Sequence, residues 1–445
     1  MEKKTILFII LGIILLMLIP IPNRIKDGGS IEYKAILYKI TKVHRLNEFS
    51  PTGYDNGLII DILSKNIYNK VEKHESTETI DPIDPTITNN DFEYDMIHLV
   101  NKETDNYIFS PYSIAYALSI LKDGASGNTK EQIEKALSSY KLDTMINIKD
   151  RISTANALFI KNKYTNDISK NYTDTIKNNY NAEILFDELK TPKIINDWAS
   201  NHTYGMIENV VDKIDEDFVL GIINALAIDV EWERQFNNKE TNKQEFTTIT
   251  NQKVNVDMMH TGEANYYIEN DKAKGIIRNY KKYDNTELQF IAILPNENIQ
   301  EYINNFDKEE LNSLMSNIKE INNKRDIKLS IPKFTIDYNY KEFKNDLIRL
   351  GIIDAFNKDN ANFKKMINDT SNLSLYVNEA VHKAHIEFTE YGTKAAAVTY
   401  FGMFKATAMP TEKEIINIVF DRPFLYIIKD KNSDNIWFFG TVYNL

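Results

Sequence analysis

The chain has 445 residues, a net charge of −11 and no cysteine. This length exceeds that of an ordinary single domain, so we expect one large domain with additional segments. The negative charge disfavours nonspecific nucleic-acid binding, and the lack of cysteine excludes disulfides, thiol catalysis and zinc–thiolate sites. We expect neither a metal nor a cofactor.

An apolar run, ILFIILGIILLMLIPI, occupies residues 6–21 and follows Lys3 and Lys4. It is shorter than the about 20 residues of a typical transmembrane helix, but its flanking residues extend it. No small-residue cleavage site follows the run, so we expect residues 1–23 to form an uncleaved signal-anchor, with a transmembrane helix. Signal cleavage followed by secretion is the alternative.

Residues 24–73 are predicted to form a small separate unit of unknown role. Residues 33–43 alternate like a strand, and residues 58–67 fit either a strand or a short helix. Residues 27–30, DGGS, resemble the start of small single-span proteins of low-GC Gram-positive bacteria, which suggests a bacterial source. Two Asp-Pro pairs make residues 74–91 an expected extended, acidic linker.

From Phe92 onward the pattern predicts alternating helices and strands. An amphipathic helix opens this region, and Ser110-Pro111 is a typical helix start. Apolar or alternating runs predict strands within residues 155–160, 222–230, 288–294, 328–334, 373–389, 416–420, 424–429 and 436–443. Residues 92–445 therefore predict one α+β domain with a large, partly buried mixed sheet.

The stretch from residue 390 to residue 410, EYGTKAAAVTYFGMFKATAMP, begins with small side chains. Propensity alone leaves strand and helix open, since Val and Thr favour strands whereas Ala favours helices. As a strand it would place Thr393, Ala395, Ala397 and Thr399 on one face, and all four are small. Such a strand could enter between two existing strands without overfilling the core. An ordinary strand followed by a loop is the simpler alternative.

Six motifs occur in order between residues 92 and 445. They are Phe109–Ile114 (FSPYSI), Asn224–Leu226 with Trp232 and Glu233, Ile331–Phe334 (IPKF), Val381–Ala384 (VHKA), Glu390–Ala397 (EYGTKAAA), and Phe420–Phe424 with Phe439 and Gly440. Together they make this region similar to the serpins, the serine protease inhibitor superfamily. One departure is Lys394, at a position where the family usually has Glu.

The resemblance implies the serpin fold: a large central mixed β-sheet, additional sheets, a helical cluster and an exposed reactive-centre loop. It also implies a serine-type endopeptidase inhibitor that acts as a suicide substrate, whose cleaved loop inserts into the central sheet and traps the acyl-enzyme. The chain would then be no enzyme, and no Gly-x-Ser-x-Gly elbow points to a hydrolase. A noninhibitory serpin that serves as a cell-surface binding or structural protein is the alternative, although the small hinge residues favour inhibition.

Motif matching assigns three groups of residues to the loop and the sheet it would enter. The hinge comprises Glu390, Gly392, Thr393, Ala395, Ala396 and Ala397. The shutter, where the central strands part, comprises Ser113, Asn224 and His382, and the breach, where the loop first enters, contains Trp232.

The family's usual spacing from Glu390 places the reactive bond at Ala406–Thr407, and a spacing one residue shorter places it at Lys405–Ala406. The first would suit elastase-like or subtilisin-like proteases, and the second would suit trypsin-like proteases. The implied partner is thus a target serine protease. We expect a monomer, held as a single-pass protein of the cell membrane through its N-terminal helix, with the serpin domain extracellular.

Overall fold

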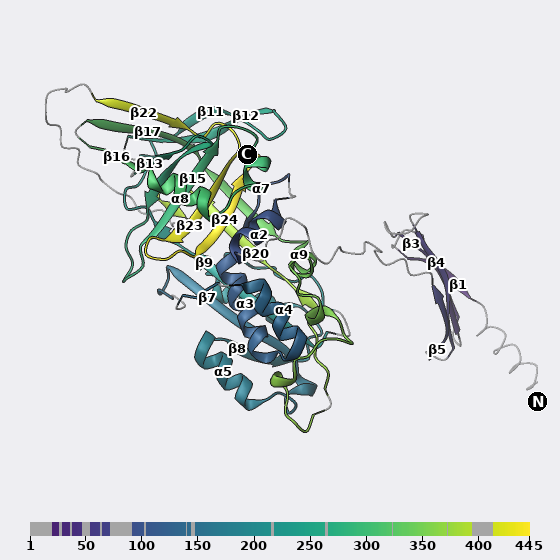
Figure 1. Cartoon of the computed structure of the whole chain (residues 1–445). Coiled ribbons are helices and arrows are strands. Elements are labelled where there is room, and N and C mark those ends of the chain that lie inside the picture. Colours follow the sequence, from purple (N-terminus) through teal and green to yellow (C-terminus); the bar gives the residue numbers. More distant parts are fainter. Residues whose placement is uncertain are drawn as a thin grey trace, which may run out of the picture. The chain divides into compact units, whose positions relative to one another are not determined.

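The computed structural model describes residues 20–25, 29–35, 38–46, 54–62, 65–71, 91–101, 104–138, 140–143, 147–214, 218–262, 266–322, 324–371, 373–393 and 413–445. The chain divides into two compact units, Met1–Ile80 and Asp81–Leu445 (Figure 1). Most of the predicted signal-anchor lies outside the described residues. Among those that are described, no helix has the length and apolar character needed to cross a membrane.

The first unit contains one antiparallel five-stranded sheet whose strands follow in chain order. They are β1 (Ile21–Arg24), β2 (Ile31–Lys34), β3 (Tyr38–Leu46), β4 (Tyr54–Ile62) and β5 (Lys65–Val71). The alternation of residues 33–43 thus falls in β2 and β3. The helical alternative for residues 58–67 is wrong, because their described part lies in β4 and β5.

The helices of the second unit open with the predicted amphipathic segment. The described α-helices are α2 (Phe92–Val100), α3 (Pro111–Gly124), α4 (Gly127–Leu137), α5 (Lys170–Tyr180), α6 (Lys193–His202), α7 (Ile299–Asn304), α8 (Lys308–Ser316) and α9 (Phe343–Arg349). The predicted start of α3 is confirmed, since the Ser110 hydroxyl accepts a hydrogen bond from the Ser113 backbone N–H at 3.0 Å and Pro111 begins the helix.

Two of the sheets in this unit contain the chain's C-terminal strands. The seven-stranded sheet has the order β16–β13–β14–β15–β23–β24–β6, and a four-stranded sheet has the order β11–β12–β17–β22. Their strands are β6 (Ile108–Phe109), β11 (Asn242–Thr247), β12 (Lys253–Thr261), β13 (Tyr266–Glu269), β14 (Ala273–Asn279), β15 (Leu288–Pro295), β16 (Lys319–Glu320), β17 (Arg325–Pro332), β22 (Glu414–Val419), β23 (Phe424–Asp430) and β24 (Ile436–Val442).

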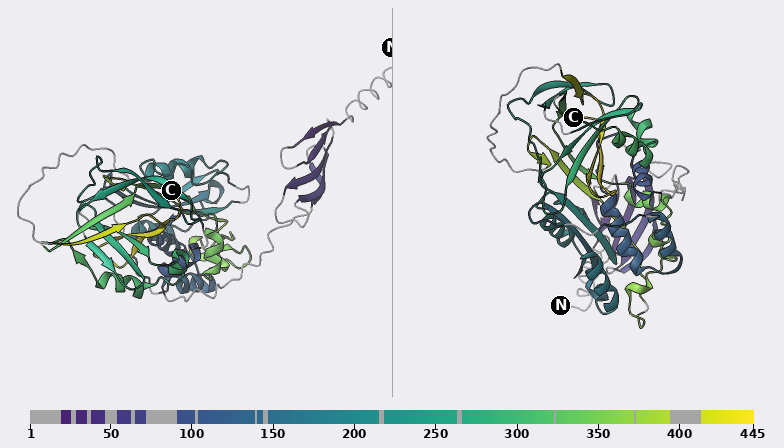
Figure 2. Two further views of the ribbon diagram at one scale, coloured as in Figure 1. Left: turned by 90° about the horizontal axis from the view of Figure 1, so that it is seen from above. Right: turned by 60° about the vertical axis from the view of Figure 1, so that its left-hand side comes forward.

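The large sheet expected from the sequence is present in two halves that meet at one seam. One half has the order β19–β9–β7–β8, and the other has the order β10–β21–β20–β18. Their strands are β7 (Ile152–Lys161), β8 (Glu183–Asp187), β9 (Leu220–Ile228), β10 (Val230–Glu231), β18 (Phe334–Asn339), β19 (Glu379–Ala380), β20 (Lys383–Phe388) and β21 (Gly392–Thr393). Helix α3 packs against both β9 and β24, so it lies between the sheet layers (Figures 1 and 2).

Candidate functional site

The site is the seam between the two halves of this divided sheet. At one end the seam is closed, because β19 pairs in parallel with the start of β9, with Glu379 opposite Gly221 and Ala380 opposite Ile222. Beyond this point β9 and β20 lie side by side, yet no β-ladder joins them among the described residues. Two neighbouring strands are thus present without the hydrogen bonds that normally join them.

At the other end of the seam, the first hinge residues already act as a short strand. Gly392 lies opposite Glu231 and Thr393 lies opposite Val230, so β21 is antiparallel to β10. Thr393 also lies opposite Phe388 of β20, again antiparallel. A continuation of β21 between β9 and β20 would therefore run antiparallel to both neighbours and could hydrogen-bond to both.

Glycine is required at position 392 by the closeness of the neighbouring backbone. A Cβ atom on Gly392 would lie 2.1 Å from the Val230 carbonyl oxygen and 2.8 Å from the Glu231 Cα atom. These contacts involve backbone atoms, which cannot turn away as a side chain can. The predicted hinge glycine therefore allows β21 to fit beside β10.

Thr393 is held in the sheet by its side chain as well as by the ladder. It is only 1% exposed, and its Oγ1 lies 2.5 Å from the Tyr280 hydroxyl oxygen. Tyr280 is itself buried, and desolvation raises the pKa of its hydroxyl well above the usual range, so this group stays protonated and can donate. Tyr280 was not predicted as a hinge partner, because it lies 113 residues before Thr393 and outside the matched motifs.

The turn before β21 is fixed by Glu390, which is 5% exposed. Its carboxylate accepts a hydrogen bond from the Thr241 hydroxyl at 2.9 Å and forms an ion pair with the Lys333 ammonium at 3.0 Å. Its carbonyl oxygen accepts from the Phe236 backbone N–H at 2.9 Å. A buried carboxylate with a cation and a hydroxyl partner is satisfied, so Glu390 anchors the base of the loop. The IPKF motif contains Lys333, but its pairing with Glu390 was not foreseen.

Trp232 lies at the entrance to the seam, at the position that motif matching assigned to the breach. Its ring is fully buried and stacks on Tyr280 with centroids 4.3 Å apart and planes at 12°. Its Nε1–H donates to the Thr389 carbonyl oxygen at 2.9 Å, and its backbone N–H donates to the Tyr391 carbonyl oxygen at 2.9 Å. Trp232 thus joins the hinge turn to the aromatic core beneath it.

Replacing Tyr280 by Phe should loosen the hinge without changing its packing. The variant keeps the ring on Trp232 but leaves the buried Thr393 hydroxyl without this partner, which costs about 1–3 kcal/mol. We expect faster hydrogen exchange at the backbone amides of the hinge, measured by mass spectrometry. Tyr172→Phe serves as the control, because it removes another buried tyrosine hydroxyl, which donates to the Ile120 carbonyl oxygen at 3.0 Å from α5, outside the hinge. Unchanged exchange in Tyr280→Phe would show that the hydroxyl pair does not hold the hinge.

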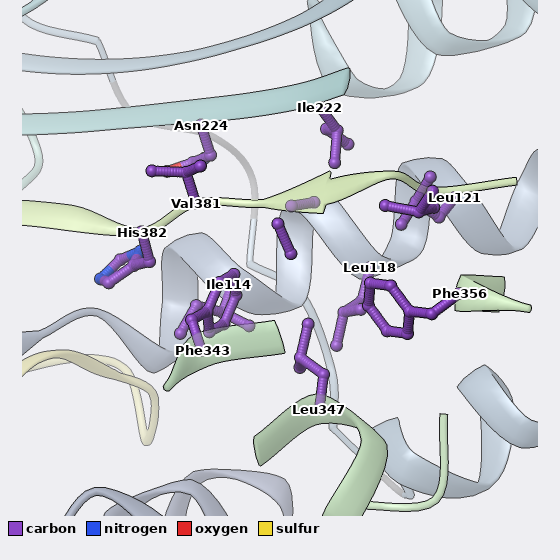
Figure 3. A pocket seen from close by; sticks show the side chains of 13 residues that line it. Ile114, Leu118, Leu121, Ile222, Asn224, Phe343, Leu347, Phe356, Val381 and His382 are labelled. Atoms are coloured by element: carbon purple, nitrogen blue, oxygen red, sulfur yellow. The ribbon is translucent and has the colours of Figure 1, made fainter. Parts of the chain in front are cut away.

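Two of the three predicted shutter residues, Asn224 and His382, lie beside the seam and the third, Ser113, lies in α3; among the described residues no hydrogen bond joins any two of their side chains. Asn224 of β9 and His382, next to β20, line the same cavity (Figure 3). The Asn224 amide donates to the Asn156 side-chain oxygen at 2.6 Å, whereas His382 Nε2 accepts from the Ser110 backbone N–H at 3.1 Å. Ser113 lies in the first turn of α3, and its buried hydroxyl has no hydrogen-bond partner among the described residues.

The cavity lies beneath the seam and is largely apolar. It has room for about one water molecule, about 20 Å³. Figure 3 shows Ile114, Leu118 and Leu121 of α3 facing it, with Phe343 and Leu347 of α9 on another side. The buried Asn224 side-chain oxygen accepts no hydrogen bond from any residue that the structure describes. An open ladder, an unpaired amide oxygen and a cavity therefore coincide at one place, which makes the seam a weakly bonded part of the core.

Burial should make the stability of this site depend on His382 protonation. Desolvation lowers the pKa of His382 to about 4, below the usual 6.5. The stability that the neutral imidazole contributes to the fold is therefore present in full above pH 6.5 and is lost as the pH falls towards 4. Relative to His382→Gln, the wild type should lose about 3 kcal/mol of stability between pH 7 and pH 4, measured by urea unfolding.

The quantity to follow is the difference in unfolding free energy between the wild type and His382→Gln. Burial also raises the pKa of Glu93 to about 8, and this gives the stability the opposite pH dependence. That contribution is common to both chains and cancels in the comparison. A wild-type advantage that stays constant from pH 7 to pH 4 would contradict the assignment of a buried neutral imidazole.

Several predicted site residues lie outside the described residues. They are Ala395, Ala396 and Ala397 of the hinge and Lys405, Ala406 and Thr407 of the two possible reactive bonds. The next described residue is 413, and β22 then pairs in parallel with β17, with Glu414 opposite Arg325. The loop therefore leaves one sheet at β21 and joins another at β22. Among the described residues, no cluster of side chains suited to a metal ion is present.

The fold and the site define a protein with a divided central sheet whose seam holds the short strand β21 at one end, and comparison with known proteins identifies that class. The family model described as "Serpin (serine protease inhibitor)" matches residues 87–445. The chain therefore belongs to the serpin family.

Three relatives illustrate the similarity. An uncharacterised serpin-like protein of Methanosarcina acetivorans is 31% identical, over 80% of this chain and 86% of the relative. The plasma serine protease inhibitor of Bos taurus is 29% identical, over 83% of this chain and 95% of the relative. The crystal structure of the thermophilic serpin tengpin in its native state has a TM-score of 0.69 and 30% identity, over 82% of this chain and 95% of that one. The bacterial source suggested by the sequence stays a prediction.

Proposed function

We propose that this chain inhibits serine proteases as a suicide substrate. A protease attacks the loop that follows β21, forms an acyl-enzyme at the reactive bond, and stalls because the cleaved loop enters the seam between β9 and β20. The observation that carries this proposal is the position of Gly392 and Thr393, which already occupy the first two places of a strand antiparallel to both neighbours. Each further residue that enters can complete hydrogen bonds that the described seam lacks.

The energetics of the seam also favour insertion of the loop as a strand. In the conformation described, β9 and β20 are adjacent without a ladder and the cavity beneath them is apolar. A strand with the small inward side chains Ala395, Ala397 and Thr399 would add backbone hydrogen bonds on both sides while adding little volume to the core. The intact chain then stores free energy that loop insertion releases, and its lifetime is set by a kinetic barrier.

We propose Ala406–Thr407 as the reactive bond, with Lys405–Ala406 as the alternative. An alanine before the cleaved bond suits elastase-like or subtilisin-like proteases, and a lysine suits trypsin-like ones. The Bos taurus relative is named a plasma serine protease inhibitor, which supports a serine protease as the partner. A noninhibitory, cell-surface role is the competing function. The small hinge and its seating between two strands favour inhibition over that role.

We also propose that residues 1–23 anchor the chain as a single-pass membrane protein, with the serpin domain outside the cell. This proposal rests on the apolar run of residues 6–21 and on the absence of a recognisable cleavage site after it. Under this arrangement the inhibitor would protect the surface of the cell that carries it.

The test is to incubate the full chain with elastase, subtilisin and trypsin and to analyse the products on denaturing gels. A covalent complex that survives SDS is the expected result, and the mass of the released C-terminal peptide identifies the bond. A peptide that begins at Thr407 supports the first assignment, and one that begins at Ala406 supports the second. Cleavage by all three proteases with no complex would favour the noninhibitory role.

A further inference from the structure

The sheet of the first unit carries its described acidic side chains on only one of its two faces. Strand register assigns each side chain to a face, because directly opposed residues of an antiparallel pair share a face. We call one face the acidic face. It holds all three described acidic residues of the sheet, Glu32, Asp55 and Asp61, together with Lys34 and Lys39. The Lys39 ammonium lies 3.6 Å from the Glu32 carboxylate and 3.2 Å from the Asp61 carboxylate.

The opposite face, which we call the apolar–basic face, has no acidic residue among the described side chains. Register places on it Pro22, Arg24, Ile31, Tyr33, Tyr38, Ile40, Lys42, His44, Asn56, Leu58, Ile60, Ile62 and Lys70. Seven of these are isoleucine, leucine or tyrosine, and three are lysine or arginine. Such a composition differs sharply from a solvated sheet face, where charges of both signs are normally interspersed.

The buried side chains of the described strands of this sheet lie on the acidic face, although Ile21, at the edge of that face, is 71% exposed. On the acidic face Thr41 and Val43 are each 7% exposed and Asp55 is 2% exposed. On the apolar–basic face Leu58 is 36% exposed and Ile62 is 44% exposed. The described part of this unit is a single sheet, so it provides no second layer to cover these side chains. Adjacent exposed aliphatic residues of this kind indicate a contact surface.

Two observations identify what this face contacts. The first is its place in the chain: β1 begins at Ile21, where the apolar run of residues 6–21 ends. If that run spans a bilayer, no linker separates the sheet from the membrane surface. The second is charge: residues 20–73 contain nine Lys or Arg and six Asp or Glu, whereas the whole chain has 53 and 64. A basic unit directly beside the bilayer is attracted to anionic lipid headgroups.

We propose that the apolar–basic face of this sheet lies on an anionic phospholipid surface. Arg24, Lys42 and Lys70 contact lipid phosphates, Tyr33 and Tyr38 lie at headgroup level as interfacial aromatic residues do, and the aliphatic side chains enter the boundary with the acyl chains. The acidic face, on which Thr41, Val43 and Asp55 are buried, then points away from the bilayer. This inference rests on the proposed anchor, and it gives residues 24–73 a role: holding the base of the chain flat on the membrane.

The test uses single-cysteine labelling, for which the chain has no competing thiol. Leu58→Cys and Lys42→Cys place a fluorophore on the apolar–basic face, and Lys34→Cys places it on the acidic face as the matched control. The full chains are reconstituted into vesicles of phosphatidylglycerol and phosphatidylcholine. We expect nitroxide-bearing lipid to quench the labels at positions 58 and 42, and aqueous iodide to quench the label at position 34.

Each other outcome has a distinct meaning. Chains that float with the vesicles while the labels at positions 58 and 34 are equally open to iodide retain the anchor and overturn the proposed face. Unlabelled Leu58→Cys chains that form disulfides between copies under an added oxidant, while the label at position 58 shows no lipid quenching, would make the face a dimer interface instead. Chains that do not float with anionic vesicles would overturn the anchor and the face together. Protease inhibition is measured separately and is independent of all three results.

Discussion

Thr393→Arg should convert the proposed inhibitor into a substrate. The wild-type side chain is 1% exposed, lies between Val230 and Phe388 in the ladder, and shares a hydrogen bond with Tyr280. No described carboxylate is paired with Thr393 in this place, so an arginine would have to bury an uncompensated charge or leave the sheet. Leaving a buried charge without a partner of opposite charge costs about 3–5 kcal/mol.

A barrier to insertion raised by about 3 kcal/mol slows this step by about a hundredfold. Deacylation would then precede trapping, so the protease would cleave the loop and dissociate as an active enzyme. The measurement is the molar ratio of inhibitor consumed per protease inhibited, together with the yield of SDS-resistant complex. Thr393→Ser keeps a small side chain and a hydroxyl and should inhibit normally. Wild-type complex yield from Thr393→Arg would refute the role assigned to β21.

Trp232→Ala should give the largest loss of native stability at the seam. The side chain is fully buried, stacks on Tyr280, and packs edge-on against Phe290 and Phe388 with centroids at 5.8 and 5.3 Å. Removing a buried tryptophan typically costs about 3–5 kcal/mol. The variant also loses the Nε1–H donor to the Thr389 carbonyl oxygen, so the hinge turn is freed at the same time.

A second buried tryptophan separates general destabilisation from an effect on the hinge. Trp437 is 1% exposed and stacks on Tyr112 with centroids at 5.3 Å, in β24. Both Trp232→Ala and Trp437→Ala should lower the unfolding temperature. Only Trp232→Ala should also speed hydrogen exchange at residues 390–393 and shorten the time for which the intact chain stays inhibitory. Equal exchange at the hinge in the two variants would show that Trp232 acts through overall stability alone.

Local patterns in the sequence were enough to predict much of the fold. The capping serine and the proline defined the start of α3, and continuous apolar runs marked β9 and β15, because burial on both faces removes polar residues. Residues 58–67 were ambiguous because a short apolar run fits helix and strand equally well. In the structure β4 pairs with β3, which makes this segment a strand. Strand pairing depends on contacts with other parts of the chain, so local sequence alone does not predict it.

The site was predicted by motif rather than by chemistry, and this explains what was missed. The hinge, shutter and breach positions followed from matched motifs, so residues outside the motifs were not found. Tyr280 contacts Thr393 across 113 positions of sequence, and Thr241 contacts Glu390 across 149. The division of the central sheet along β9 and β20 was likewise invisible, since both segments carry ordinary strand patterns and only their pairing shows the open ladder. The four-part domain division also stays a prediction.

The most direct test of the account compares the thermal stability of the full chain before and after cleavage of its loop. If the seam between β9 and β20 accepts the freed loop as a strand, the cleaved chain gains ladder hydrogen bonds on both sides, and its unfolding temperature should rise well above that of the intact chain. The rise should be lost or strongly reduced in Thr393→Arg. An unfolding temperature that is unchanged or lowered by cleavage would show that the loop does not insert, and it would contradict inhibition by trapping.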